Sequence, residues 1–271
     1  MKTRVIVSVI LLPLLLLVVL VLPKIFTAIL FGVIAALSTY ELLVGTGYME
    51  RSLPVVQACV GAFLVSLWSY FGAGHIWAIA GILVYTVLLF VQILLSGGKL
   101  PFTQAVSCFF AGILLPFLLT SIVRIHGADA GRFYILIPFL IAFLSDTGAY
   151  FIGCAFGKHK LAPVISPNKT VEGLLGGVAF AMTGMAFFCL ILQLFFSFKV
   201  NYLFALLYGI LGSLAAVMGD LSFSVIKRQT GIKDYGKLIP GHGGMLDRFD
   251  SMMMVAPLVE ALLILIPVVV K

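Results

Sequence analysis

Charged residues are scarce in this sequence: only 10% of its 271 residues are Asp, Glu, Lys or Arg, whereas 62% are hydrophobic. A soluble domain carries about 25% charged residues, so this chain could not cover a globular surface that faces water. The mean hydropathy of +1.22 agrees with this. The composition therefore excludes a soluble protein and predicts an integral membrane protein.

Cysteine pairs and basic tails are also missing. None of the four cysteines stands in a C-x-x-C spacing, and all lie in or beside apolar runs. We expect them to be small buried apolar residues rather than zinc ligands or disulfide partners. The net charge of +7 comes without a basic tail or a basic-aromatic repeat, so no nucleic-acid partner is expected.

Apolar runs that could cross a bilayer recur along the chain, since a crossing helix needs about 20 such residues. We predict an all-α polytopic bundle of about nine transmembrane helices joined by short turns that contain Pro, Gly or charge. The predicted spans are 5–22, 25–44, 53–71, 75–95, 103–123, 133–153, 172–197, 201–221 and 251–270. The first has no small-residue cleavage site after it, so we predict a retained helix rather than a signal peptide.

Most Lys and Arg residues fall on one side of this topology, which the positive-inside rule assigns to the cytoplasm. The two long polar loops, 154–171 and 222–250, lie on that side. We therefore predict an inner (cytoplasmic) membrane protein with a polar active-site cavity that faces the cytoplasm. Residues 1–130 would form a scaffold without assigned chemistry, in which Glu41 is an interfacial residue, and residues 131–271 the catalytic region.

Polar residues at helical spacing lead into the last long loop. If the preceding helix continues, Asp220, Ser224 and Lys227 share one face at i, i+4 and i+7. An acid at the end of an apolar span is costly when it faces lipid, so Asp220 is expected to face the protein interior or water and to bind a cation. A structural Asp220–Lys227 pair is the alternative, and the spacing alone does not separate the two.

The loop itself has the composition of a polyphosphate site. Gly241, Gly243 and Gly244 allow positive φ and close approach of the backbone to an anion, and consecutive amides can form an anion-binding concavity. Asp247 and Asp250 share a helix face and could hold Mg²⁺, which prefers oxygen ligands and substrate phosphates. The basic residues that would bind phosphate are Lys227, Arg228, Lys233, Lys237 and Arg248.

Two upstream segments also carry polar residues. Asp146 interrupts an apolar run, where a polar lining or a metal contact is favoured over lipid exposure. Lys169 lies where a helix begins, and a helix N-terminus with a nearby cation binds phosphate well. The alternative for Lys169 is a surface pair with Glu172.

The run from Ser224 to Asp250 resembles the signature of the phosphatidate cytidylyltransferases, also called CDP-diacylglycerol synthases. The signature is S-x-apolar-K-R, four residues, K-D-x-G, then P-x-H-G-G-x-x-D-R-x-D, and it is matched without departure. The segments 145–158 and 166–173 resemble two further family blocks, although the family more often has Lys or Gly where Asn168 stands. The resemblance covers about residues 140–255. The matching signature residues are Ser224, Lys227, Arg228, Lys233, Asp234, Gly236, Pro240, His242, Gly243, Gly244, Asp247, Arg248 and Asp250.

The resemblance implies that CTP and phosphatidic acid, a membrane lipid, react to CDP-diacylglycerol and pyrophosphate in phospholipid biosynthesis. It also implies Mg²⁺, in a pair of divalent or mixed cations, and a homodimer. Our hypothesis for the site is that Asp220 and Asp247 hold Mg²⁺, assisted by Asp250 and Asp146. His242 could be a general acid toward pyrophosphate or could order the loop by a hydrogen bond. The catalytic candidates are Asp220, Lys227, His242, Asp247 and Asp250. The substrate-binding candidates are Asp146, Lys169, Ser224, Arg228, Lys233, Gly243, Gly244 and Arg248.

Two other functions fit parts of the sequence. A CTP-dependent lipid kinase of the dolichol or phytol kinase type would also use acidic and basic motifs in a membrane, but the full signature favours the cytidylyltransferase. A transporter would use intramembrane acids as an ion path and would show inverted repeats. Because the polar features lie in one half of the chain only, a transporter is disfavoured.

Overall fold

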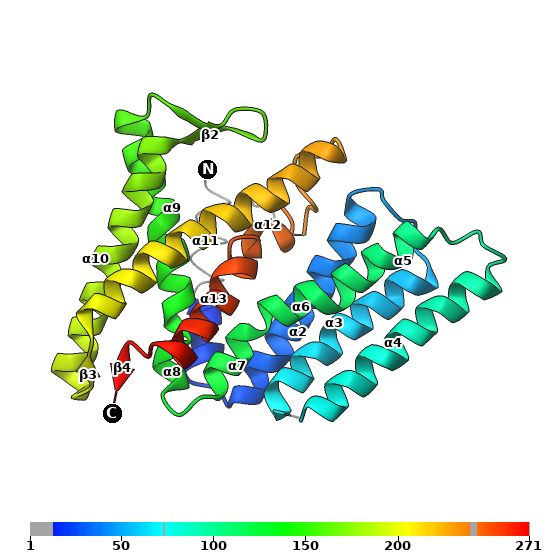
Figure 1. The fold of residues 1–271 in the computed structure, drawn as a ribbon, viewed down its shortest axis with the longest axis horizontal. Helices are drawn as coiled ribbons and strands as arrows, with labels where there is room; N and C mark the ends of the chain where they lie inside the picture. Colours follow the sequence, from blue (N-terminus) through cyan, green and yellow to red (C-terminus); the bar gives the residue numbers. More distant parts are fainter. Residues whose placement is uncertain (1–12, 73, 239–242, 271) are drawn as a thin grey trace. The chain divides into compact units, whose positions relative to one another are not determined.

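The computed structural model describes residues 13–72, 74–238 and 243–270 of the chain. Helices dominate it (Figure 1), and within this part of the chain seven helical segments are long and apolar enough to cross a membrane. Each overlaps a predicted span, which confirms a polytopic helical membrane protein. The segments are Lys24–Gly45, Leu53–Phe71, His75–Leu95, Phe102–Gly127, Gly131–Phe156, Val171–Phe196 and Tyr202–Gln229.

The first and last predicted spans are not among the seven. The first, 5–22, begins outside the described residues, and its described part is helical from Pro13 to Leu20. For the last, the prediction of one helix over 251–270 is wrong, because α13 (Met252–Leu265) has only 14 residues. Such a helix is about 21 Å long, whereas the hydrocarbon core is about 30 Å thick. Pro267 follows the end of α13, and a proline has no N–H with which to continue a helix.

The chain divides into two compact units, each described here by itself. Unit 1 comprises Met1–Arg132 and Lys227–Phe249, and unit 2 comprises Phe133–Ile226 and Asp250–Lys271. The elements up to the start of unit 2 are α2 (Lys24–Tyr40), the π-helix η1 (Glu41–Gly45), α3 (Leu53–Phe71), α4 (His75–Leu95), α5 (Phe102–Phe109), the π-helix η2 (Phe110–Leu114), α6 (Leu115–Leu119), α7 (Ser121–Gly127) and α8 (Gly131–Tyr134). Unit 1 also holds α12 (Leu246–Phe249) and the last residues of α11 (Tyr202–Gln229).

Buried hydroxyl groups join the helices of unit 1. Ser66 on α3 donates a hydrogen bond to the Ala28 carbonyl on α2, and Thr39 on α2 donates to the Ala111 carbonyl on η2, both at 2.7 Å. In a membrane such bonds to neighbouring helices satisfy polar groups that lipid cannot. They hold α2, and therefore η1 at its end, in a defined position.

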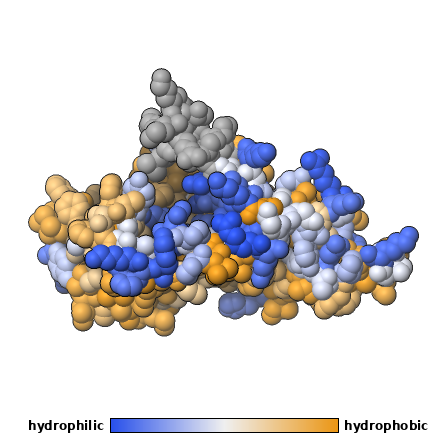
Figure 2. Space-filling view, turned by 90° about the horizontal axis from the view of Figure 1, so that it is seen from above, coloured by the Kyte–Doolittle hydropathy of each residue, from blue (hydrophilic) through white to orange (hydrophobic). Residues whose placement is uncertain are grey.

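The surface of the molecule is rich in apolar side chains. Hydrophobic residues cover much of the face seen in Figure 2, and α4 exposes large apolar side chains along its whole length, from Ile76 to Leu95. A water-soluble monomer rarely exposes so large an apolar surface. The exposure is the one expected for helices that face lipid.

Unit 2 is built around α9 (Leu136–Phe156) and α10 (Val171–Phe196), which run side by side in Figure 1. Their backbones touch at glycines: a Cβ on Gly148 would lie 2.6 Å from the Gly176 carbonyl oxygen, and one on Gly177 2.7 Å from that of Ser145. Small residues permit such contact between membrane helices. Part of the segment 145–158, singled out as a family block, therefore has a packing role.

A short hairpin and a second, long-range pair of strands add β-structure to the predicted all-α fold. The predicted loop 154–171 contains β1 (Lys160–Ala162), antiparallel to β2 (Ser166–Thr170), and β3 (Lys199–Val200) pairs with β4 (Val269–Val270). The hairpin leads directly into α10, where Thr170 caps the helix by accepting a hydrogen bond from the Gly173 amide at 3.1 Å. This turn places Lys169 at the base of α10.

All four cysteines are free thiols, as predicted. Cys108 and Cys189 are buried and Cys59 is half-buried, but Cys154, near the end of α9, is exposed. The expectation of burial is therefore wrong for Cys154.

Candidate active site

Helix α11 continues through Gln229, so the last polar loop begins later than the predicted position 222. Asp220, Ser224 and Lys227 consequently lie on one helix, as their spacing predicted. The Ser224 hydroxyl donates a hydrogen bond of 3.1 Å to Oδ1 of Asp220, and Ser224 is buried. Ser224 was expected to bind substrate, and in the structure its hydroxyl orients the Asp220 carboxylate.

Lys169 forms an ion pair with Asp220 inside unit 2, between Nζ and Oδ2. Both side chains are partly accessible, at 24% and 29% exposure. The alternative pairing of Lys169 with Glu172 is not the one observed: Glu172 accepts hydrogen bonds from the Lys158 amide and from Nδ1 of His159. Unit 2 thus places a cation directly beside a candidate metal-binding carboxylate.

Asp250 also belongs to unit 2, and its backbone lies against α11. A Cβ on Gly219 would come within 2.6 Å of the Asp250 carbonyl oxygen, so this approach requires glycine. The Asp250 carboxylate is buried and accepts a 2.7 Å hydrogen bond from the Ser251 amide. The residue before Asp220 and the backbone of Asp250 are therefore in direct contact.

Unit 1 contains the second acidic group, centred on Asp247, whose side chain is only 3% exposed. Its Oδ1 accepts a 2.9 Å hydrogen bond from Nζ of Lys227, and its Oδ2 accepts bonds from the amides of Tyr235 (2.8 Å) and Gly244 (3.0 Å). A structural pair therefore does involve Lys227, but with Asp247 rather than with Asp220. A carboxylate has about four acceptor positions, so these bonds leave one on Oδ1 for a further ligand.

The glycines of the loop fulfil the prediction in part. Gly243 has a φ of +85°, a conformation that glycine adopts without strain. The amide of Gly244, expected to face a substrate anion, donates instead to Asp247. Gly241 and His242 lie outside the described residues.

Glu41, expected to be an interfacial residue, is a buried part of this group. The residue is 6% exposed, and its carboxylate accepts hydrogen bonds from the amides of Met245 (2.9 Å) and Leu246 (2.8 Å). The sequence does carry a signal for this role: Glu41 is an acid at the end of an apolar span, and such an acid is expected to face the protein interior, as Asp220 is.

The remaining candidates are more exposed. Arg228, Lys233 and Arg248 are exposed polar residues of the signature, and Asp146 lies on the exposed side of α9. The three basic side chains are accessible to a ligand such as a nucleotide phosphate.

No group of three or more His, Cys, Asp or Glu side chains that could hold a metal ion occurs among the described residues. Mg²⁺ does not require one, because it is commonly bound by one or two carboxylates together with substrate phosphates and water. Asp247 in unit 1 and Asp220 in unit 2 each carry a carboxylate oxygen of the kind that Mg²⁺ prefers.

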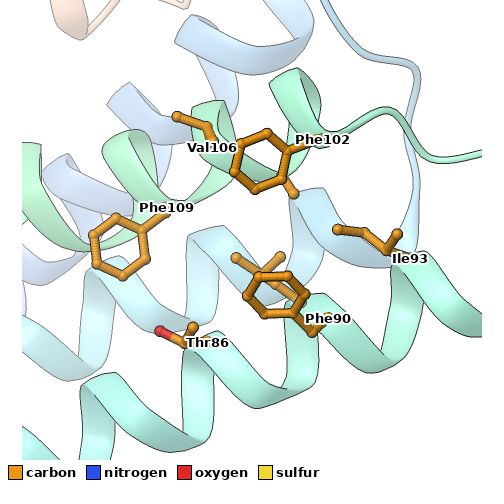
Figure 3. Close-up of a pocket in the computed structure, with 8 residues that line it drawn as sticks. Thr86, Phe90, Ile93, Phe102, Val106 and Phe109 are labelled. Atoms are coloured by element: carbon orange, nitrogen blue, oxygen red, sulfur yellow. The ribbon is translucent and has the colours of Figure 1, made fainter.

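A pocket between α4 and α5 offers no comparable chemistry (Figure 3). Its lining is apolar apart from Thr86, whose hydroxyl donates to the carbonyl of Ile82 on the same helix. The labelled residues are Thr86, Phe90 and Ile93 on α4 and Phe102, Val106 and Phe109 on α5. These residues could accommodate an acyl chain, but they could not bind phosphate.

Comparison with known proteins identifies the family. The profile of the cytidylyltransferase family matches residues 2–266. A phosphatidate cytidylyltransferase of Staphylococcus epidermidis is 41% identical over 186 residues, which is 68% of each chain. Others, from Staphylococcus saprophyticus and Staphylococcus aureus, are 36% identical over 221 and 241 residues, covering 79% and 86% of this chain and 80% and 88% of theirs. This chain, with the acidic and basic groups described above, therefore belongs to the cytidylyltransferase family.

Proposed function

We propose that this protein transfers the cytidylyl group of CTP to phosphatidic acid, giving CDP-diacylglycerol and pyrophosphate in phospholipid biosynthesis. The observation that carries the proposal is the likeness to proteins named phosphatidate cytidylyltransferase, which extends over 86% of the chain at 36% identity. The paired acidic and basic residues of the signature support it, because both substrates are phosphate anions.

The reaction explains why such residues are needed. An oxygen of the lipid phosphate attacks the α-phosphorus of CTP, the bond from that phosphorus to the oxygen of the β-phosphate breaks, and pyrophosphate leaves. The attacking oxygen is already anionic, so no strong general base is required. The obstacle is repulsion between two anions, which fixed positive charge and alignment of the reacting groups reduce.

We propose Mg²⁺ as the cofactor, in a site with two divalent or mixed cations, with Asp220 and Asp247 as ligands and Asp250 and Asp146 assisting. Bound Mg²⁺ would neutralise phosphate charge and polarise the α-phosphoryl group. Carboxylate oxygens are the donors that Mg²⁺ prefers. The hydrogen bonds from Ser224 to Asp220 and from two amides to Asp247 would hold these oxygens in place.

The basic residues would bind the substrate phosphates. Lys169 lies beside Asp220, and Lys227 beside Asp247. A phosphate oxygen bound by either lysine would lie next to a carboxylate. The phosphate and that carboxylate could then both be ligands of one metal ion. The exposed Arg228, Lys233 and Arg248 would grip the triphosphate or the lipid phosphate, and the role of His242 stays a prediction.

Purified protein in phospholipid–detergent micelles tests the function. With CTP labelled at the α-phosphate and phosphatidic acid, we expect the label in the lipid and release of pyrophosphate, in a reaction that requires Mg²⁺. In a parallel assay with a lipid alcohol in place of phosphatidic acid, label recovered as free CDP together with an unlabelled phosphorylated lipid would instead identify a lipid kinase. ATP and dCTP, tried in place of CTP, would define the nucleotide specificity.

We also propose that the site faces the cytoplasm from the inner membrane and that the protein works as a homodimer. The Lys/Arg distribution supports the orientation, and the family resemblance supports the dimer. Labelling of single cysteines introduced at Lys99 and Arg132 in intact cells tests the orientation, because only a residue outside reacts with an impermeant reagent. The mass of the detergent-solubilised protein tests the dimer.

A further inference from the structure

We infer that Glu41 is a positioning residue for the proposed cytidylyl transfer: its carboxylate holds the backbone turn that orients Asp247. The inference rests on the proposed function for its activity readout. The structural contacts that support it all lie inside unit 1.

The position of Glu41 in its helix is unusual. It is the first residue of η1, where the hydrogen bonding of the second span changes from α to π. Such π segments are rare and occur frequently at functional sites. The change alters the helical register at the point where Glu41 meets the signature segment.

The carboxylate is bound by main-chain groups of that segment. Oε1 accepts from the Met245 amide and Oε2 from the Leu246 amide. The next residue along the chain is Asp247, which accepts from the Gly244 amide. The three consecutive amides of this turn are thus divided between two carboxylates, and displacement of Glu41 would release two of them.

Two signature glycines leave room for the Glu41 side chain. A Cβ on Gly236 would lie 2.9 Å from Cδ of Glu41, and one on Gly244 would lie 2.7 Å from the same atom. A Cβ on Gly45, also in η1, would collide with the Tyr235 carbonyl oxygen. The anion that this glycine-rich segment approaches closely is therefore a carboxylate of the protein itself.

Glu41 does not bind substrate in this scheme, because both of its oxygens accept amides of the protein and the residue is buried. It acts through Asp247. Its loss should therefore lower the rate of the chemical step more than the affinity for CTP or phosphatidic acid.

The test compares Glu41→Gln with Glu50→Gln, the same substitution at an exposed glutamate of the same unit. In Glu41→Gln the new NH₂ group faces a backbone amide donor. We expect kcat to fall at least tenfold with both KM values within about threefold, whereas Glu50→Gln stays at the wild-type values. A Glu41→Gln protein with unchanged kcat, or with its whole loss in KM, would overturn the inference.

A double substitution tests whether Glu41 acts through this contact. Gly236→Ala should lower kcat at least tenfold in the wild-type background. In the Glu41→Ala background the same substitution should lower kcat less than twofold, because the carboxylate that the added Cβ would meet is gone. Equal effects of Gly236→Ala in the two backgrounds would contradict the proposed packing.

Amide hydrogen exchange of the protein in micelles provides a readout without activity. Glu41→Gln should accelerate exchange in peptides that contain Met245 and Leu246, and Glu50→Gln should not. Unchanged exchange in these peptides would refute the inference even if cytidylyl transfer is confirmed. Conversely, absence of cytidylyl transfer in the wild-type protein would refute the proposed function and leave the exchange test valid.

Discussion

The ion pair between Lys227 and Asp247 makes the sharpest quantitative prediction. Replacing Asp247 with Asn preserves the shape of the side chain but removes its charge. The amide group of Asn presents one acceptor oxygen and one donor NH₂ where the carboxylate accepts from Lys227, Tyr235 and Gly244. At least one of these donors then faces another donor.

The size of the effect follows from burial. The two side chains are 12% and 3% exposed, so solvent screens the pair little. A charge-assisted hydrogen bond contributes about 1.5–3 kcal/mol, and a buried donor left unpaired costs about 1–3 kcal/mol. We therefore expect Asp247→Asn to destabilise the protein by about 3–5 kcal/mol, the range for breaking a buried pair. Turnover should be nearly abolished in any protein that remains folded.

Reversible unfolding in mixed micelles, with turnover measured on the folded fraction, checks both effects. Asp129→Asn, the same change at an exposed turn of unit 1, should alter stability by less than about 0.5 kcal/mol and leave turnover unchanged. The double variant Lys227→Met/Asp247→Asn should be more stable than the sum of the single effects predicts, by about 1.5–3 kcal/mol. Additive single effects would refute the ion pair, and wild-type turnover in Asp247→Asn would refute the catalytic assignment.

Three further predictions concern the Lys169–Asp220 pair, the helix packing and the metal. Lys169→Met should lower kcat/KM about 100-fold, because it removes a positive charge from the phosphate site. It should change the free energy of unfolding by less than about 1 kcal/mol, because the pair with Asp220 is partly exposed. Lys160→Met, at an exposed lysine of the same hairpin, is the activity control, and an equal loss of activity in both variants would contradict the assignment. Gly148→Ala should lower the free energy of unfolding by about 1–3 kcal/mol, because the added Cβ pushes α9 away from α10. Gly81→Ala is the control and should be tolerated, because a Cβ there meets no atom within 4 Å. Equal unfolding midpoints for the two variants would contradict the close packing. Removal of divalent cations with EDTA should abolish turnover and excess Mg²⁺ should restore it, and turnover that persists in EDTA would rule out the proposed cofactor.

The local features of the fold and site could be predicted from the sequence. The scarcity of charge determines the membrane class, because so few polar side chains cannot cover a soluble surface. Apolar runs of bilayer length locate the seven spans found. The i, i+4 spacing of Asp220 and Ser224 predicts a common helix face, and their hydrogen bond shows it. Each of these features depends on residues close together in the chain.

The partners of the charged groups were decided by the tertiary structure. Lys227 could have paired with Asp220 on its own helix, but it pairs with Asp247, 20 residues away. Glu41 binds amides more than 200 residues further along the chain. Helical periodicity predicts which residues share a helix face, but it does not predict which distant segment packs against that face. The sequence by itself thus determined the class of the protein and the residues available for its chemistry, while only packing determined which carboxylate holds which lysine or amide.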